Sequence, residues 1–205
     1  MTGVNGEIRI APLADTDIAA VIALASEIWN LHYPGIISVA QIDYMLGQRY
    51  SAEAIRRQLA GGRAWWDTLF VDGRLAGFAS IEAGGRPQAD KLDKIYLHPR
   101  FQGCGLGSRL LAHVAAGAGA RGSRRLWLQV NKHNRRAIEA YLRNGYRIVE
   151  SVTADIGQGF VMDDYIMERL IGQEASQNRR EVRGARPGGA LLRMAGSGGA
   201  RLQSR

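Results

Sequence analysis

The chain has a single cysteine, Cys104, and it lacks both a long apolar run and an N-terminal signal pattern. One cysteine excludes an intrachain disulfide and offers no spacing for a cysteine-based metal site, so we expect no zinc. No apolar run approaches the roughly 18 residues that span a bilayer. Residues 1–7 lack the basic and apolar regions of a secretory signal. We therefore expect a cytoplasmic protein without a membrane partner or a bound metal.

Positive charge is concentrated at the C-terminal end. Residues 171–205 hold seven arginines and two glutamates, a net charge of +5 out of the chain's +8. The segment is rich in Gly, Arg, Ser and Ala and has little apolar periodicity, which predicts a disordered basic tail. We expect no nucleic-acid partner beyond weak, salt-dependent contacts of these arginines with RNA, and a solvated extension without a role is the simpler interpretation. Residues 1–170 are long enough for one domain with a full core.

A strand, a glycine turn and a helix follow one another without a gap in the middle of the chain. Residues 91–97 alternate apolar and polar side chains, as a half-buried strand does. Gln102 to Ser108 holds three glycines in alternation, and an apolar helix face with Leu110, Leu111 and Val114 begins directly after it. A glycine turn at a helix start is a site for phosphate, because the backbone can approach a ligand and the first N–H groups are free.

Two other phosphate motifs fit this turn poorly. A P-loop ends in Gly-Lys-Ser/Thr, but here the end is Leu106-Gly107-Ser108, without the lysine. A dinucleotide site needs G-x-G-x-x-G and an acidic residue at the end of the next strand, which closes here on Asn131. A nucleotide-dependent oxidoreductase is therefore disfavoured. A plain loop or a helix C-cap is the simpler alternative, but neither needs three glycines directly before a helix.

Two motifs together resemble the GNAT family of N-acetyltransferases. Gln102, Gly105 and Gly107 match the family's Q/R-x-x-G-x-G/A loop. Residues 134–146 resemble its N-x-x-A-x-x-x-Y-x-x-x-G-F/Y pattern, with Tyr146 where phenylalanine is commoner. The resemblance covers roughly residues 7–170. It implies an α/β fold with a mixed, mostly antiparallel sheet of six to seven strands, flanking helices and a central βαβ unit.

The segments on either side of these motifs are consistent with the fold that the resemblance implies. Capping residues Asp15 or Thr16, Ser38 and Ser51 predict three helices. Asp72-Gly73 predicts a hairpin between strands 65–71 and 75–82. The remaining strands are expected at 7–11, 126–130, 147–154 and 160–170, with the last turn at 155–159.

The resemblance implies acetyl-CoA as cosubstrate. The cofactor-binding positions that match are Ile95, Tyr96, Leu97, Gln102, Gly103, Cys104, Gly105, Leu106, Gly107, Ser108 and Asn134. Among them, the Leu97 N–H is expected to stabilise the charge that develops on the thioester oxygen. Cys104 lies inside the phosphate loop with no histidine in the motif, so we interpret it as a spacer and not as a nucleophile.

The catalytic groups are expected on a helix and on the strands. Tyr141 stands where the family's tyrosine protonates the departing thiolate. The glutamate that some members place on the central strand is Lys91 here, which leaves Asp93 and Glu82 as candidates for the general base, or as ordinary carboxylates at strand edges. Asp163 and Asp164 could instead attract a cationic acceptor.

These observations predict an acetyl-CoA-dependent N-acetyltransferase that acts on a primary amine, either a small amine or an amino group of a peptide or protein. We expect direct attack in a ternary complex. The alternative is a non-catalytic module that binds acyl-CoA, or that binds RNA through its tail. An exposed final strand is able to pair edge to edge, so a homodimer stays open.

Overall fold

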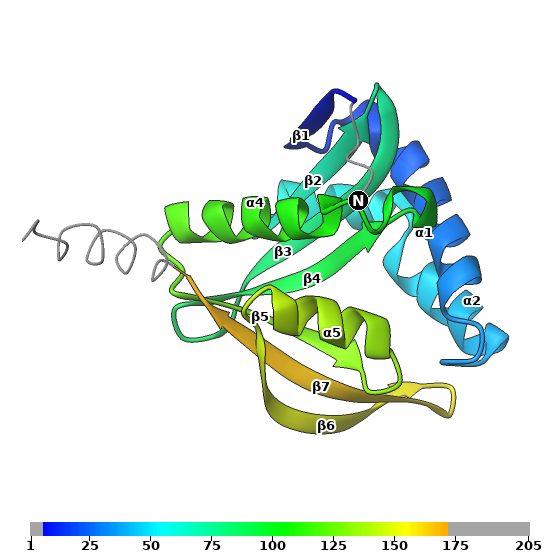
Figure 1. The fold of residues 1–205 in the computed structure, drawn as a ribbon. Helices are drawn as coiled ribbons and strands as arrows, with labels where there is room; N and C mark the ends of the chain where they lie inside the picture. Colours follow the sequence, from blue (N-terminus) through cyan, green and yellow to red (C-terminus); the bar gives the residue numbers. More distant parts are fainter. Residues whose placement is uncertain (1–5, 172–205) are drawn as a thin grey trace, which may run out of the picture. The chain divides into compact units, whose positions relative to one another are not determined.

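Strands and helices follow one another in the predicted order in the computed structural model, which describes residues 6–171 (Figure 1). The strands are β1 (Ile8–Pro12), β2 (Ala64–Val71), β3 (Arg74–Arg86), β4 (Ala89–Leu97), β5 (Arg125–Asn131), β6 (Arg147–Gly157) and β7 (Phe160–Leu170). The α-helices are α1 (Ile18–His32), α2 (Val39–Arg49), α3 (Ala52–Ala60), α4 (Leu106–Ala120) and α5 (Arg135–Arg143). Two 3-10 helices, η1 (Asp15–Asp17) and η2 (Pro99–Phe101), precede α1 and α4.

All of these strands form one mixed sheet. Their order is β1-β2-β3-β4-β5-β7-β6, and every neighbouring pair is antiparallel except β4 and β5. Helix α4 connects the parallel pair, because a crossover must return the chain to the same end of the sheet. The predicted fold class and its central βαβ unit are confirmed.

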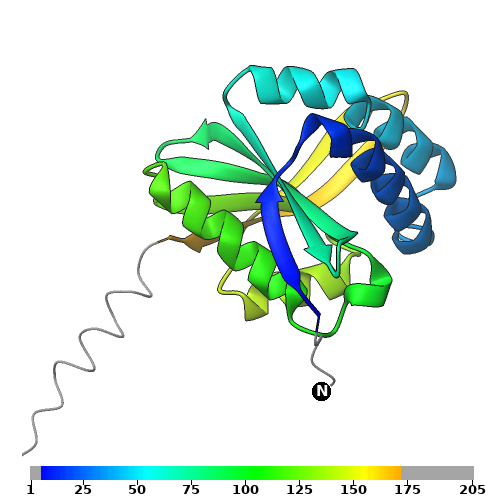
Figure 2. The same ribbon diagram turned by 90° about the horizontal axis from the view of Figure 1, so that it is seen from above.

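The sheet is covered on both faces (Figures 1 and 2). Helix α4 packs its apolar stripe on one face, where Leu110, Val114 and Leu128 are almost fully buried, and Tyr141 of α5 packs against the same core. Helices α1, α2 and α3 cover the other face, around Phe78 and Trp66. Neighbouring residues of β3, such as Phe78 and Ala79, serve opposite cores because side chains alternate along a strand.

Strands β4 and β5 separate after three residue pairs. Their pairing runs from Ala89 to Lys91 of β4, whereas β4 stays paired with β3 as far as Leu97. In the described part of the chain, the part of β4 that follows Lys91 therefore has a free edge facing β5. This opening positions the candidate functional site.

The predicted start signals of α2 and α3 are confirmed. The hydroxyls of Ser38 and Ser51 each accept a hydrogen bond from the backbone three residues later, at 3.2 Å and 3.0 Å. The prediction that Asp15 or Thr16 caps α1 is wrong, because both lie in η1 and no side-chain bond caps either helix start. Asp15 instead accepts two hydrogen bonds from Arg56, whose planar fork fits a carboxylate better than one backbone N–H does.

Two hairpin turns bring distant strands together. Asp72 and Gly73 have φ angles of 49° and 74°, which is the predicted two-residue turn between β2 and β3. Gln158 and Gly159, with φ angles of 54° and 77°, make the same kind of turn between β6 and β7. That turn is shorter than predicted, since β6 continues to Gly157.

The predicted basic tail lies outside the described residues, except for Ile171. Within residues 6–171, no helix is long and apolar enough to cross a membrane.

Candidate functional site

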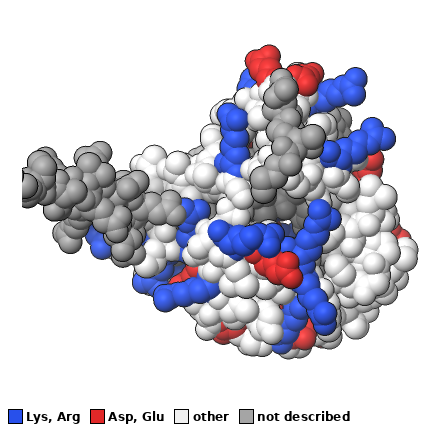
Figure 3. Space-filling view, viewed as in Figure 1, with Lys and Arg blue, Asp and Glu red and all other residues white. Residues whose placement is uncertain are grey.

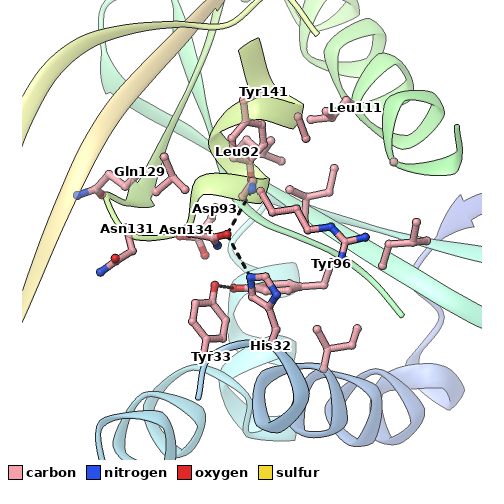
Figure 4. A pocket seen from close by; sticks show the side chains of 18 of the residues that line it. His32, Tyr33, Leu92, Asp93, Tyr96, Leu111, Gln129, Asn131, Asn134 and Tyr141 are labelled. Atoms are coloured by element: carbon pink, nitrogen blue, oxygen red, sulfur yellow. Dashed lines mark hydrogen bonds between the residues drawn. The ribbon is translucent and has the colours of Figure 1, made fainter. Parts of the chain in front are cut away.

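A cavity of about 630 Å³ occupies the opening between β4 and β5. Its walls come from the ends of α1 and α2, from β4 and β5, from the turn before α4, from α5, and from β6 and β7. Figure 4 shows Tyr141 of α5 on one side of the cavity, with His32 and Tyr33 from the end of α1 on the opposite side. Both faces of the sheet thus contribute to one pocket.

The glycine turn forms one end of this pocket. Gly103 and Gly105 have φ angles of 83° and 84°, a conformation that strains other residues, and Gly105 is the N-cap of α4. No side chain caps α4, so its first N–H groups stay available to an anion. A Cβ atom added at Gly103, Gly105 or Gly107 would meet nothing within 4 Å, which leaves this surface open to a ligand.

Positive side chains also line the pocket. Arg136 and Arg143 of α5 line the pocket. On the face seen in Figure 3, the surface is hollowed between α4 and α5, and Lys and Arg side chains lie around the hollow. The combination of free helix N–H groups and arginines suits a diphosphate.

The end of β4 carries backbone groups that face the opening. The His98 N–H donates to the Ala76 carbonyl of β3 at 2.9 Å. Because N–H groups alternate in direction along a strand, the Leu97 N–H points away from β3 and toward the gap. Gln102 Nε2 donates to the Leu97 carbonyl at 2.7 Å, and Gln102 Oε1 is buried without a hydrogen-bond partner among the described residues. Gln102 therefore links the turn to the strand end.

Helix α5 supplies the predicted amide and phenol. Asn134 caps α5, because its Oδ1 accepts from the Ala137 N–H at 3.3 Å, and the same oxygen accepts from His32 Nε2 at 3.2 Å. Tyr141 lies two turns further along and lines the pocket. Burial raises the pKa of the Tyr141 phenol well above its ordinary value, and the nearby Tyr33 adds to the rise. The Tyr141 phenol is thus held in its protonated form.

Asp93 is the residue that a β-bulge leaves unpaired in β4. Ser80 of β3 pairs with Lys94 and Ile81 pairs with Leu92, so Asp93 is skipped. Its carboxylate contacts three cations: Arg49 at 2.8 Å, Lys91 at 3.1 Å and Lys94. Burial alone would raise the pKa of this carboxyl, but the three cations outweigh burial and hold the pKa well below its ordinary value. A carboxylate stabilised in this way is a poor proton acceptor.

Glu82, the second candidate for the base, does not line the pocket. It stands beside Ala64 of β2 in the sheet and accepts a hydrogen bond from Gln58 Nε2 at 3.2 Å. In the described chain, the carboxylates that line the pocket are Asp93 and Asp164. Asp164 is buried in β7, and its Oδ1 has no hydrogen-bond partner among the described residues.

Most residues that the motifs predicted for the site do meet around one cavity. Those that line it are Asp93, Ile95, Tyr96, Leu97, Gln102, Gly103, Gly105, Gly107, Ser108, Asn134 and Tyr141. Leu106 is buried beneath the turn, and Cys104 turns its thiol to the Phe101 carbonyl at 3.0 Å, so neither lines the cavity. Among residues 6–171, no group of three His, Cys, Asp or Glu side chains is placed to hold a metal ion.

The sequence motifs missed Arg49, which binds Asp93 from the last turn of α2. A lone arginine at a helix end is an ordinary feature, so no signal was available. Asp164 was named in the sequence, together with Asp163, as able to attract a cationic acceptor, because two adjacent acidic residues in a mostly apolar strand place one carboxylate on each face.

The sequence profile described as Acetyltransferase (GNAT) family matches residues 27–146 of the chain. An uncharacterized N-acetyltransferase of Mycobacterium tuberculosis is 30% identical over 154 residues, which are 75% of this chain and 97% of that protein. A spermidine N(1)-acetyltransferase of Thermoplasma acidophilum is 25% identical over 160 residues, covering 76% of this chain and 96% of that protein.

Solved structures agree with the fold. The crystal structure of the PaiA N-acetyltransferase from Thermoplasma acidophilum, in complex with coenzyme A, superposes with a TM-score of 0.68 at 24% identity. The match covers 80% of this chain and 99% of that one.

Proposed function

The chain belongs to the GNAT family of acetyltransferases, and from this premise we propose that it transfers the acetyl group of acetyl-CoA to a primary amine by direct attack. As a member of the family it is an acyltransferase with acetyl-CoA as its cosubstrate. The observation that carries the proposal is the opening between β4 and β5, with a glycine turn at one end and Tyr141 in its wall. The acceptor amine and the roles of single residues belong to the proposal.

The glycine turn, the end of β4 and α5 form what we call the cofactor half of the pocket. Backbone N–H groups of residues 102–108 and the start of α4 bind the diphosphate of acetyl-CoA, and Arg136 and Arg143 add positive charge. The buried Gln102 Oε1 lacks a partner in the described chain, so it can accept a hydrogen bond from a ligand. Ile95, Tyr96 and Asn134 line the path of the pantetheine arm between the strands.

When bound, acetyl-CoA supplies an activated thioester whose carbonyl carbon is open to attack by an amine. The Leu97 N–H stabilises the negative charge that develops on the thioester oxygen, because a fixed donor in a partly dry site costs no reorganisation. The Tyr141 hydroxyl gives its proton to the departing sulfur. Its raised pKa keeps the phenol protonated until the thiolate forms.

The end of α1, the end of α2 and β7 form the acceptor half. Tyr33, Arg49 and Asp164 lie in this part of the wall, on the face of the sheet opposite Tyr141. A pocket that runs through the sheet lets an amine reach the thioester from the other side. The relative named for spermidine supports a small amine as one class of acceptor, and a peptide amino group is the other class.

Direct attack is supported by the position of Cys104. The Cys104 thiol donates a hydrogen bond to the Phe101 carbonyl and does not line the pocket. An acetyl-cysteine would therefore form outside the described site. Initial rates measured at several concentrations of both substrates should give intersecting lines, whereas parallel lines would contradict direct attack.

The test is calorimetry with the full chain, followed by a thiol-release assay. We expect one-to-one binding of acetyl-CoA, no comparable binding of NADPH or ATP, and thiol release when spermidine or a short peptide with a free amino group is added. Binding without thiol release for any amine in a broad panel would support the non-catalytic alternative. Binding of NADPH would contradict the assignment of the turn.

A further inference from the structure

The two carboxylates that line the pocket have opposite surroundings. Asp93 is held by three cations, which keep it ionised and stabilised. Asp164 takes part in no ion pair within the described chain and is 3% exposed, although it lines the cavity. Buried polar atoms are normally paired, so an unpaired carboxylate oxygen on a pocket wall calls for an explanation.

The position of Asp164 in β7 directs it into the acceptor half. It stands opposite Asn131 of β5 and Val152 of β6. Asp163 next to it faces the other side of the sheet, where Lys132 and the Thr153 hydroxyl bind its carboxylate. Met162, two residues before Asp164 and on the same face, also lines the pocket.

Charged groups on several elements influence Asp164 electrostatically. Burial and the charge of Asp163 raise its pKa, and the more distant cations Lys91, Arg49 and Lys132 oppose that rise, which leaves the pKa at about 6. Burial raises the pKa of Tyr33 at the end of α1, and the charge of Asp164 adds to that rise. The carboxyl group can therefore be ionised at neutral pH and still accept a proton at low cost.

On the basis of the proposed acetyl transfer, we propose that Asp164 is the general base that takes the proton from the acceptor's ammonium group. An ammonium group supplies the donor that Asp164 Oδ1 lacks in the described chain. The other two carboxylates suit this task less well, because Asp93 forms ion pairs that stabilise its ionised form and Glu82 lies outside the pocket. Asp164 thus recognises the charge of the acceptor and removes it.

Asp164 and Tyr141 together account for every proton that moves in the reaction. The ammonium nitrogen gives one proton to the Asp164 carboxylate, and its lone pair then forms the N–C bond. As the C–S bond breaks, the sulfur takes the proton of the Tyr141 hydroxyl. The tyrosinate recovers a proton from the newly acylated nitrogen, and Asp164 releases its proton to solvent. The net products are the amide, the free thiol and one proton.

The first test compares Asp164→Asn with Asp163→Asn in the full chain, with spermidine and glycinamide as probes. Asp164→Asn should lower kcat/KM at pH 7 about a hundredfold and abolish the acid limb of the pH profile near 6, while acetyl-CoA binds with unchanged affinity. Part of the rate should return at high pH, where the amine loses its proton in solution. Asp163→Asn should keep the rate at pH 8 and move the acid limb slightly downward.

A second measurement needs no turnover. The ¹³C resonance of the Asp164 carboxyl, assigned with the Asn variant, should titrate near pH 6, and spermidine or glycinamide should lower that midpoint. Titration at the pH of exposed aspartates, or no response to either amine, would overturn the base assignment. Asp164→Asn with an unchanged pH profile would overturn it as well. Failure of the wild-type protein to bind acetyl-CoA would instead refute the proposed function itself.

Discussion

The two halves of the pocket differ in the kind of group that lines them. The cofactor half consists mainly of backbone groups from one continuous stretch, the end of β4 and the glycine turn. Helix α5, which comes soon after in the sequence, completes it. The acceptor half uses side chains from segments that are far apart in sequence, such as Arg49 of α2 and Asp164 of β7. A backbone site binds a ligand that is the same in every reaction, whereas a side-chain site can be changed for each acceptor.

The difference extends to electrostatics. Free N–H groups and arginines make the cofactor half suitable for an anion. Beside the acceptor half, Asp93 of β4 is neutralised by three cations, one of them Arg49 of α2, whereas Asp164 within this half has no ion-pair partner in the described chain. We infer that the paired carboxylate maintains the shape of the wall and that the unpaired one does the chemistry. Variants can test each part of this comparison.

Asp93→Asn should have the largest effect, on folding. The substitution leaves Arg49, Lys91 and Lys94 together without their shared carboxylate, which should cost about 3–5 kcal/mol in the free energy of unfolding. Because the folded-state pKa of Asp93 lies below the unfolded value, its contribution is present above pH ~4 and is lost as the pH falls below that. Urea denaturation at pH 7 measures it. The exposed Glu53, paired with Arg57, is the control, since Glu53→Gln should change stability by less than about 0.5 kcal/mol.

Tyr141→Phe should leave folding intact and lower kcat about a hundredfold, because the departing thiolate loses its proton donor. Acetyl-CoA affinity, measured by calorimetry, should change less than about twofold. Tyr146→Phe is the matched control: its ring lies 5.6 Å from that of Tyr141, its hydroxyl is buried without a partner among the described residues, and it does not line the pocket. Equal loss of kcat in both variants would remove the special role of Tyr141.

Gly105→Ala should weaken acetyl-CoA binding about tenfold. At a φ angle of 84°, an alanine costs about 1–2 kcal/mol, and relief of this strain would displace the N–H groups at the start of α4. Gly122→Ala introduces the same kind of strain just beyond the other end of α4, at a φ angle of 92° and away from the pocket. Both variants should lose similar stability, and only the first should lose affinity. Similar affinities for acetyl-CoA would contradict the role of the turn.

Asp164→Asn should stabilise the fold by about 1 kcal/mol at pH 8, or roughly 2–4 °C in Tm. The folded-state pKa of about 6 lies above the unfolded carboxyl value, so ionised Asp164 costs stability above pH 6, and the cost disappears as the pH falls below about 4. Thermal melts of both proteins at pH 4 and pH 8 measure the difference. A variant that is less stable than the wild type at pH 8 would show that Asp164 has a structural partner.

The sequence predicted which residues gather in the cofactor half, because the glycines, Asn134 and Tyr141 lie in one βαβ stretch and their spacing reflects backbone geometry. The fold followed from hydrophobic periodicity and turn residues, including the caps Ser38 and Ser51. The bulge at Asp93 was not predictable, since it depends on the pairing of β3 with β4.

Apart from the adjacent carboxylates Asp163 and Asp164, the acceptor half could not be predicted, for the same physical reason. The pairing of Arg49 with Asp93 joins residues 44 positions apart, and only the packed fold brings them together. Asp93 and Glu82 were reasonable candidates as carboxylates on neighbouring strands, but the ion pairs of one and the position of the other become visible only in three dimensions. The same holds for the burial of Asp164.

The central claim is that backbone amides of the cofactor half hold acetyl-CoA and leave the acceptor half free. Hydrogen–deuterium exchange of the full chain, with and without saturating acetyl-CoA, tests this most directly. We predict slower exchange in residues 95–97 and 102–109, with little change in α2 and in β7. Protection in α2 and β7, with none in the glycine turn, would contradict the account.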